Sequence, residues 1–143
     1  MAEGILKAKV KAAGLSQYLR VASAGVKASP IRCQPDLRAQ KISLKYGIDI
    51  SKIKSKRFTD KDYHHDYILV MDEEQRDQLK HLYPEQANHK VQLLLSYARA
   101  EGDQQIPDPY YGNVHGFEYI YHLLDEATDA FLATLDIVKN KNE

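Results

Sequence analysis

Two short apolar runs separated by a helix-forming stretch constrain the fold of this chain most strongly. They occupy residues 66–71 (Asp-Tyr-Ile-Leu-Val-Met) and residues 91–95 (Val-Gln-Leu-Leu-Leu). Nearly continuous apolar runs of this length are typical of strands that are covered on both faces. Between the runs, Asp72 provides a helix N-cap and Pro84 a stop. A strand, a helix and a strand in this order predict an α/β fold with parallel strands.

The rest of the chain adds helices and one more strand to this unit. We expect a strand over residues 18–24 and helices over residues 2–17, 36–46, 59–64 and 114–138. Gly47 lies where glycine commonly ends a helix. The first helix has no preceding residue to cap its amides. The elements predict a single domain, residues 1–143, built as a three-layer sandwich with a mostly parallel sheet. The sequence predicts only three strands, although its helices suffice to cover both faces of a sheet.

Composition excludes several classes of function. The 143 residues contain 20 basic and 20 acidic side chains, so the formal charge is zero and gives no case for nucleic acid or an anionic membrane surface. No apolar run approaches the roughly 20 residues that span a bilayer. The one cysteine, Cys33, allows no intrachain disulfide and no cysteine metal cluster. We expect a cytoplasmic protein without a metal or another cofactor.

Four groups of residues, taken in order, resemble the low-molecular-weight protein tyrosine phosphatases. The resemblance extends from the first residue to about Leu135, and residues 107–112 are its most specific part because a long helix follows them. It implies the Rossmann-like fold of that family. The groups are Ser-Ala-Gly at 23–25, Pro-Asp-Leu-Arg-Ala at 35–39 with Gly-Ile-Asp at 47–49, Asp-Tyr-Ile-Leu-Val-Met-Asp at 66–72, and Pro-Asp-Pro-Tyr-Tyr-Gly at 107–112.

The resemblance also implies that a central part of the family's active site is absent from this chain. In the family a strand and a Cys-x5-Arg-Ser-Pro loop precede Met-Ala-Glu, and Met1-Ala-Glu-Gly4 matches only the residues after that loop. The absent strand belongs between the strands near Val21 and near Ile68. The absent loop holds phosphate on backbone amides and an arginine, and its cysteine thiolate attacks phosphorus. We therefore expect an N-terminally incomplete, inactive chain.

The same resemblance gives roles to four residues that are present. Asp108 corresponds to the general acid and base, which protonates the tyrosyl oxygen and then activates water. A phenolate leaving group has a pKa of about 10, and a positioned acid contributes roughly 10²–10⁴ in rate. Tyr110 and Tyr111 are expected to contact the substrate ring, and Ser23 to support the phosphate loop. The alternatives are an ordinary Pro-Asp-Pro turn at Asp108 and tyrosines that pack within their own loop.

Other conspicuous residues are expected to have no catalytic role. Cys33 and Arg38 are separated by four residues rather than five, and Pro35 and Asp36 between them are unsuited to binding phosphate. Cys33 is thus not a substitute nucleophile. The basic run 52–57 and the pair His64-His65 are interpreted as solvated surface. His89, His115 and His122 show no metal-ligand spacing. Many family members have a histidine near Ile53, which helps to order the phosphate loop.

Three functions remain open at this point. The first is hydrolysis of phosphotyrosine in proteins, or of small aryl phosphates, through a cysteinyl-phosphate intermediate and without metal. In that case Met1 is an internal methionine, or the N-terminus was lost. The second is a pseudo-phosphatase that binds without catalysis. The third is an arsenate-reductase-like protein, although that chemistry needs additional cysteines and only Cys33 is present. The oligomeric state is not predicted.

Overall fold

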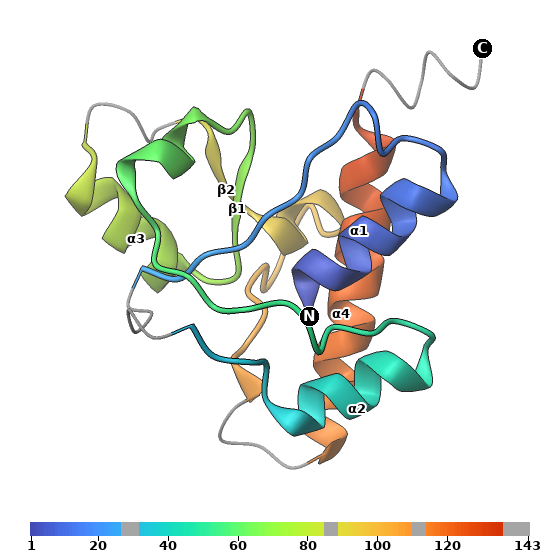
Figure 1. Ribbon diagram of the computed structural model, residues 1–143. Helices are drawn as coiled ribbons and strands as arrows, with labels where there is room; N and C mark the ends of the chain where they lie inside the picture. The colour runs from blue at the N-terminus through green and yellow to red at the C-terminus, as the bar shows by residue number, and fades with distance from the viewer. Residues whose placement is uncertain (27–31, 85–88, 110–113, 136–143) are drawn as a thin grey trace.

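The computed structural model describes residues 1–26, 32–84, 89–109 and 114–135. Figure 1 shows how its elements are arranged. In chain order they are α1 (Ala2–Ala12), α2 (Leu37–Lys45), the 3₁₀ helix η1 (Asp60–His64), β1 (Ile68–Val70), α3 (Glu73–Leu82), β2 (Val91–Leu93), the 3₁₀ helix η2 (Leu94–Tyr97) and α4 (Val114–Ala133).

The strands β1 and β2 form a parallel pair between two helical layers. Ile68 lies opposite Val91, and Val70 lies opposite Leu93. Ile68 and Val70 belong to the core that includes Leu79 of α3, whereas Leu69 packs against the core formed largely by α4. Figure 1 shows α3 on one side of the strands and α4 with α1 on the other. The α/β sandwich with a parallel sheet is therefore confirmed.

The prediction of a strand over residues 18–24 is wrong. After a turn that includes Tyr18, residues 19–24 form no regular secondary structure and follow an extended path (Figure 1), and the segment makes one isolated parallel bridge, between Gly25 and Arg57. A segment becomes a strand only when a neighbour pairs with its amides and carbonyls. Within the described ranges β1 pairs with β2 alone, so the extended segment has no strand beside it.

Helix α1 is shorter than predicted, because it ends at Ala12 and not near residue 17. Gly14 adopts a left-handed conformation with φ of 69°. The amide of Leu15 then donates to the carbonyl of Val10 at 2.9 Å, and the Gly14 amide donates to the carbonyl of Lys11 at 3.0 Å. This is the hydrogen-bond pattern of a Schellman C-cap. At the other end Met1 is the N-cap residue, and its side chain makes no capping hydrogen bond.

The other predicted helices are confirmed, with one shorter end. Gly47, with φ of 83°, ends α2 through a second Schellman motif, in which the Ile48 amide donates to the backbone carbonyl of Ser43 at 2.9 Å. The Asp72 carboxylate caps α3 by accepting from the Gln75 amide at 2.8 Å. Helix α4 ends at Ala133 and not near residue 138, because the Thr134 amide and hydroxyl both bond to the carbonyl of Phe131.

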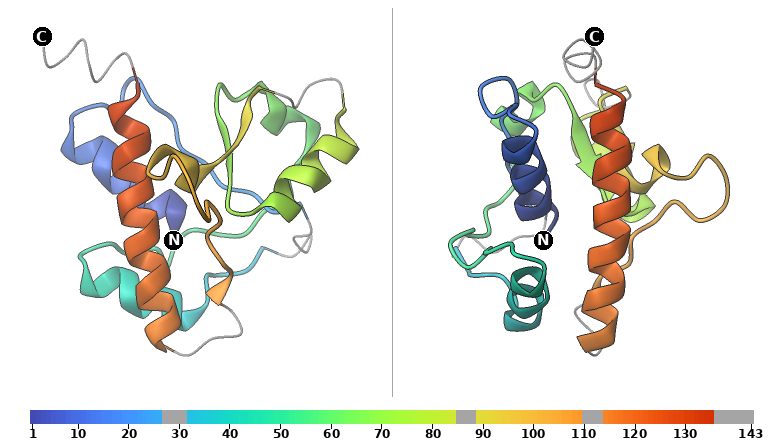
Figure 2. Two further views of the ribbon diagram at one scale, coloured as in Figure 1. Left: turned by 180° about the vertical axis from the view of Figure 1, so that it is seen from behind. Right: turned by 90° about the vertical axis from the view of Figure 1, so that its right-hand side faces the viewer.

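Helix α4 is the support on which the N-terminal half of the chain packs. Figure 2 shows α1 and α2 one above the other along α4. The buried side chains Phe117, Ile120, Leu124 and Phe131 of α4 share one core with Ile5 of α1. This packing fixes the position of α1, and therefore of the surface at its N-terminal end.

Candidate functional site

An open groove of about 390 Å³ lies beside the N-terminal half of α1. The extended segment that precedes Gly25 forms one wall, and the basic segment that precedes Arg57 forms another. The groove includes Ser23, which the sequence placed beside the phosphate loop, and Ile53, where many relatives have a histidine. Its lining residues are Glu3, Lys7, Val21, Ala22, Ser23, Arg32, Lys52, Ile53, Lys54 and Lys56.

Ser23 and Glu3 join the extended segment to the first turn of α1. The Ser23 hydroxyl donates to Oε1 of Glu3 at 2.8 Å, and the Lys7 ammonium donates to Oε2 at 2.8 Å. Burial acts to raise the pKa of Glu3, but the hydrogen bonds from Lys7 and Ser23 and the charge of Lys7 outweigh it, so the pKa lies below its ordinary value. Glu3 is therefore ionised at neutral pH, and its carboxylate connects Ser23 of the extended segment to Lys7 of α1.

The second wall of the groove is positively charged. Asp62 orients Lys56, whose ammonium lies 3.2 Å from Oδ1 of Asp62, while the Thr59 amide donates to Oδ2 at 2.8 Å. Lys52 and Lys54 also line the groove, and Glu3 is the one acidic side chain among its described lining residues. A concave surface with this excess of cations attracts phosphate-bearing ligands.

The basic run was interpreted as solvated surface, and Lys52 and Lys54 are indeed exposed, but the alignment of its lysines along one groove was not predicted. The signal was present in the spacing, because Lys52, Lys54 and Lys56 are two residues apart. In an extended segment, alternate side chains point to the same side. The run does not form a regular strand, yet its three lysines line one groove.

Cys33 is exposed and is held in place by its backbone. Its amide donates to the hydroxyl of Ser55 at 2.9 Å, and its carbonyl accepts from the Ser55 amide at 2.8 Å. The neighbouring Arg32 lines the groove, but Cys33 does not. The Arg38 guanidinium pairs with Asp36 at 2.9 Å and lies over the ring of Phe117. Cys33 and Arg38 therefore do not form a phosphate-binding loop.

Asp108 lies in the loop that follows η2, and this loop is attached to the end of β1. The amide of Ile106, which is buried, donates to the carbonyl of Met71 at 2.8 Å. The side chain of Gln105 accepts from the Glu73 amide at 3.1 Å. Asp108 itself is exposed and is not among the residues that line the groove. Its role as general acid stays a prediction.

The two tyrosines of the predicted substrate site lie outside the described residues, and the described residues can be searched for metal sites and membrane-spanning helices. Tyr110 and Tyr111 both fall in the range 110–113, which the structure does not describe. Among the described residues, no group of three or more His, Cys, Asp or Glu side chains could hold a metal ion. None of the described helices is both long enough and apolar enough to cross a membrane.

The chain matches a known protein family over almost its whole length. The sequence profile of the family described as low molecular weight phosphotyrosine protein phosphatase matches residues 1–141. The low molecular weight phosphotyrosine protein phosphatase of Homo sapiens is 33% identical over 135 residues, which cover 92% of this chain and 84% of the human protein. The Saccharomyces cerevisiae protein of the same description is 32% identical, with 92% and 84% covered.

Solved structures give the same result. A protein tyrosine phosphatase from Entamoeba histolytica superposes with a TM-score of 0.86 and 27% identity, covering 96% of this chain and 88% of that one. A Drosophila arginine phosphatase superposes with a TM-score of 0.83 and 31% identity, covering 94% and 89%. The fold, the order of the motifs and both sequence comparisons agree, and the chain belongs to the low molecular weight phosphotyrosine protein phosphatase family.

Proposed function

We propose that this chain provides the substrate cleft and the general acid of a protein tyrosine phosphatase. The observation that supports this most is the groove beside α1, where Ser23 is tied to Glu3 and three lysines form the opposite wall. A phosphorylated side chain needs positive charge and hydrogen-bond donors at one concave place. The groove offers both beside the N-terminal half of α1.

Asp108 is the proposed acid and base of the reaction. Pro107 and Pro109 restrict the backbone on both sides of it. The contact between Ile106 and Met71 anchors the loop to the sheet. An exposed carboxylate in an anchored loop can approach a leaving group without moving the core. Tyr110 and Tyr111 would contact the phenyl ring of the substrate, as their match to the family's Asp-Pro-Tyr-Tyr motif implies.

The 143 residues by themselves are proposed to be catalytically inactive. Displacement at phosphorus through a covalent intermediate requires a nucleophile that faces the phosphate. The single cysteine of these residues lies outside the groove, and no Cys-x5-Arg motif occurs among them. The general acid can assist departure of the leaving group, but it cannot replace the attacking thiolate.

An assay with p-nitrophenyl phosphate tests this proposal directly. We expect no turnover above the buffer background for the 143-residue chain, and the same for Cys33→Ser. Turnover that survives Cys33→Ser but disappears in Asp108→Asn would contradict the proposal, because it would require a nucleophile other than cysteine. Binding of a phosphotyrosyl peptide in the groove without turnover would instead favour a pseudo-phosphatase.

A second candidate substrate is phosphoarginine. The Drosophila protein that superposes with a TM-score of 0.83 is an arginine phosphatase, and its identity of 31% is similar to that of the tyrosine phosphatases. The two substrates differ in the bond that breaks, which is P–N in one and P–O in the other. A chain extended before Met1 by the family's strand and loop should be assayed with both, and we expect the greater kcat/KM with phosphotyrosine.

The proposed location is the cytoplasm. The one thiol of the sequence is exposed, and the sequence has no second cysteine with which it could form an intrachain disulfide. Such cysteine usage fits a reducing compartment. Arsenate reduction is not proposed, because it needs further cysteines to transfer electrons.

A further inference from the structure

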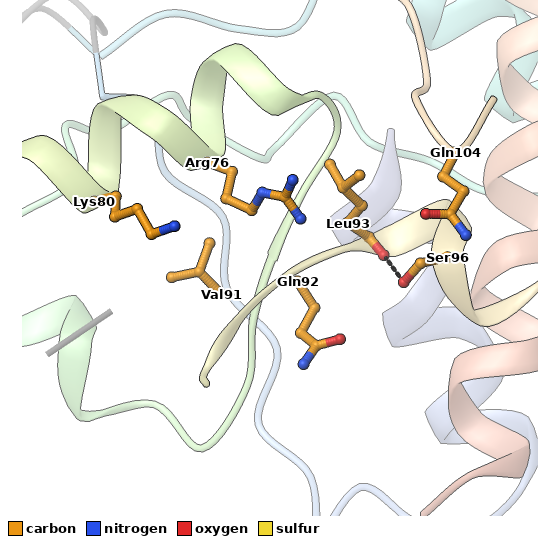
Figure 3. A pocket seen from close by; sticks show the side chains of 7 residues that line it. All are labelled: Arg76, Lys80, Val91, Gln92, Leu93, Ser96 and Gln104. Atoms are coloured by element: carbon orange, nitrogen blue, oxygen red, sulfur yellow. Dashed lines mark hydrogen bonds between the residues drawn. The ribbon is translucent and has the colours of Figure 1, made fainter. Parts of the chain in front are cut away.

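A second pocket, of about 430 Å³, lies along the outer edge of β2 (Figure 3). One side is formed by α3 and the other by β2 with the residues that follow it. It shares no lining residue with the groove beside α1. The residues that line it are Arg76, Lys80, Val91, Gln92, Leu93, Ser96 and Gln104.

The backbone of β2 offers hydrogen-bonding groups on this side. The Ile68 amide donates to the carbonyl of Lys90 at 3.1 Å, and Ile68 lies opposite Val91. In a parallel pair this register directs the amide and carbonyl of Gln92 toward β1, and those of Val91 and Leu93 away from it. Within the described residues no strand pairs with this side of β2.

One of these outward groups already has a partner. The carbonyl of Leu93 accepts from the Ser96 hydroxyl at 2.6 Å. The amide of Leu93 and both backbone groups of Val91 face the edge. An edge of this kind is a template for an added strand, whose main-chain hydrogen bonds supply affinity while side-chain contacts supply specificity.

The side chains at the pocket favour negative charge in that added strand. Arg76 and Lys80 lie one helical turn apart on α3, and Figure 3 shows both beside β2. The pairing of Arg76 with Glu73 is loose, because the two atoms are 3.5 Å apart and the side chains are 39% and 60% exposed. An exposed ion pair of this length is readily exchanged for another carboxylate. No acidic residue occurs among the described lining residues.

We propose that this pocket binds an extended acidic segment of a partner protein. The segment adds to the edge of β2 through the backbone of Val91 and Leu93. Its carboxylates contact Arg76 and Lys80, and the amides of Gln92 and Gln104 are available to its polar groups. This surface is separate from the groove beside α1, so it recruits a partner and does not take part in phosphate chemistry.

Fluorescence anisotropy with labelled hexapeptides tests the proposal on the 143-residue chain. The probe is Glu-Thr-Glu-Val-Glu-Thr, and the charge control has lysine in place of glutamate. We expect the acidic peptide to bind and the basic one not to bind. The double variant Arg76→Gln/Lys80→Gln should bind the acidic peptide about tenfold more weakly, because two exposed ion pairs are lost. Lys41→Gln, which removes an exposed charge from α2, should leave binding unchanged.

Two N-methylated versions of the acidic peptide test the strand pairing and need no protein variant. One is methylated at the odd positions and the other at the even positions. Alternate amides of an added strand face β2, so one version should lose binding and the other should retain it. Equal binding of both versions, or equal binding to wild type and to Arg76→Gln/Lys80→Gln, would overturn the proposal. Absence of binding by the acidic peptide would overturn it as well.

Discussion

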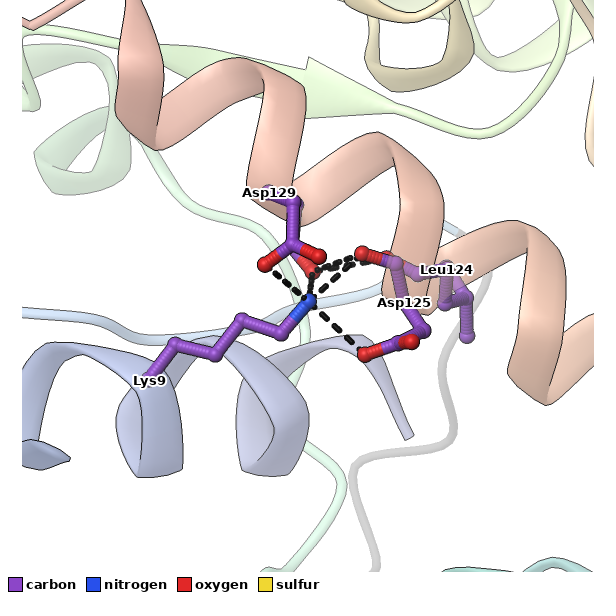
Figure 4. Close-up of polar contacts among 5 residues, drawn as sticks. Lys9, Leu124, Asp125 and Asp129 are labelled. Carbon is purple, nitrogen blue, oxygen red and sulfur yellow. Dashed lines mark hydrogen bonds and ion pairs between the residues drawn. The ribbon is translucent and has the colours of Figure 1, made fainter.

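The ammonium nitrogen of Lys9 on α1 lies 2.8 Å from Oδ1 of Asp125 on α4. It also lies 2.8 Å from Oδ1 of Asp129 (Figure 4). The hydroxyl of Thr128 lies 2.8 Å from the same nitrogen. The Lys9 side chain is 19% exposed, so much of its stem is buried between the two helices. These contacts connect the helix beside the groove to the helix that supports the core.

Replacing Lys9 should loosen this connection. In Lys9→Met the apolar stem is kept while the charge-assisted hydrogen bonds are lost. Both aspartates are more than a third exposed and can be resolvated, so the expected loss in free energy of unfolding is moderate, about 1–2 kcal/mol. Urea denaturation measures it. Lys11→Met, on the exposed side of the same helix, is the matched control and should change stability little.

Gly4 should not tolerate alanine, although alanine normally favours a helix by about 1 kcal/mol. A Cβ at Gly4 would overlap Cγ2 of Ile50 and lie 3.3 Å from Cγ2 of Ile48. Overpacking of a core costs about 1–3 kcal/mol, which exceeds the gain in helix propensity. Gly116 lies in α4, and a Cβ there would meet nothing within 4 Å. We expect Gly4→Ala to lower the melting temperature and Gly116→Ala to maintain or raise it. Equal changes in melting temperature for the two variants would show that α1 is not packed closely enough against Ile50 for a Cβ at Gly4 to overlap it.

Glu3 should make stability depend on acid pH. Its pKa in the folded protein lies below the ordinary value of 4.5, so its contribution is fully present above pH 4.5 and is lost as the pH falls through the folded pKa. The variant Glu3→Gln should melt at a lower temperature than wild type at neutral pH, and the difference should narrow below about pH 4.5. Glu101→Gln, at an exposed position, is the control. A difference that does not change with pH would show that Glu3 acts through packing alone.

The sequence predicted the parts of the fold that depend on local chemistry. The Asp72 cap and the Gly47 stop were read correctly, because each acts within one helical turn. The same rule at Gly14 was not applied, so α1 was predicted too long. The strand over residues 18–24 failed for a different reason. Pairing depends on a neighbour distant in sequence, and apolar character alone does not provide one.

The candidate site was predicted through family motifs more than through geometry. Ser23 was assigned by resemblance to support of the phosphate loop, and that role stays a prediction. Its contact with Glu3 could not be read from two residues so far apart in the chain. The three lysines of the groove were missed, although their spacing indicated a shared side. Asp108 and its adjoining tyrosines were identified by motif alone, and their roles stay predictions.

The role of Asp108 can be tested through the leaving group, in a chain extended before Met1 by the family's strand and Cys-x5-Arg-Ser-Pro loop. Asp108→Asn should slow hydrolysis of phosphotyrosine by roughly 10²–10⁴, because no acid then protonates the tyrosyl oxygen as it leaves. The loss should be much smaller for aryl phosphates whose phenols have a low pKa. An equal loss across leaving groups would exclude a role as general acid. Asp103→Asn, at an exposed position in the same loop, is the control and should retain activity.

The most direct test of the proposed function compares the 143-residue chain with the extended chain in one phosphotyrosine assay. We expect no turnover for the shorter chain. We expect turnover for the extended chain that is abolished when the added loop cysteine is replaced by serine and is unaffected by Cys33→Ser. Two results would contradict it. One is turnover by the shorter chain, and the other is a folded extended chain that binds phosphate but hydrolyses no aryl phosphate.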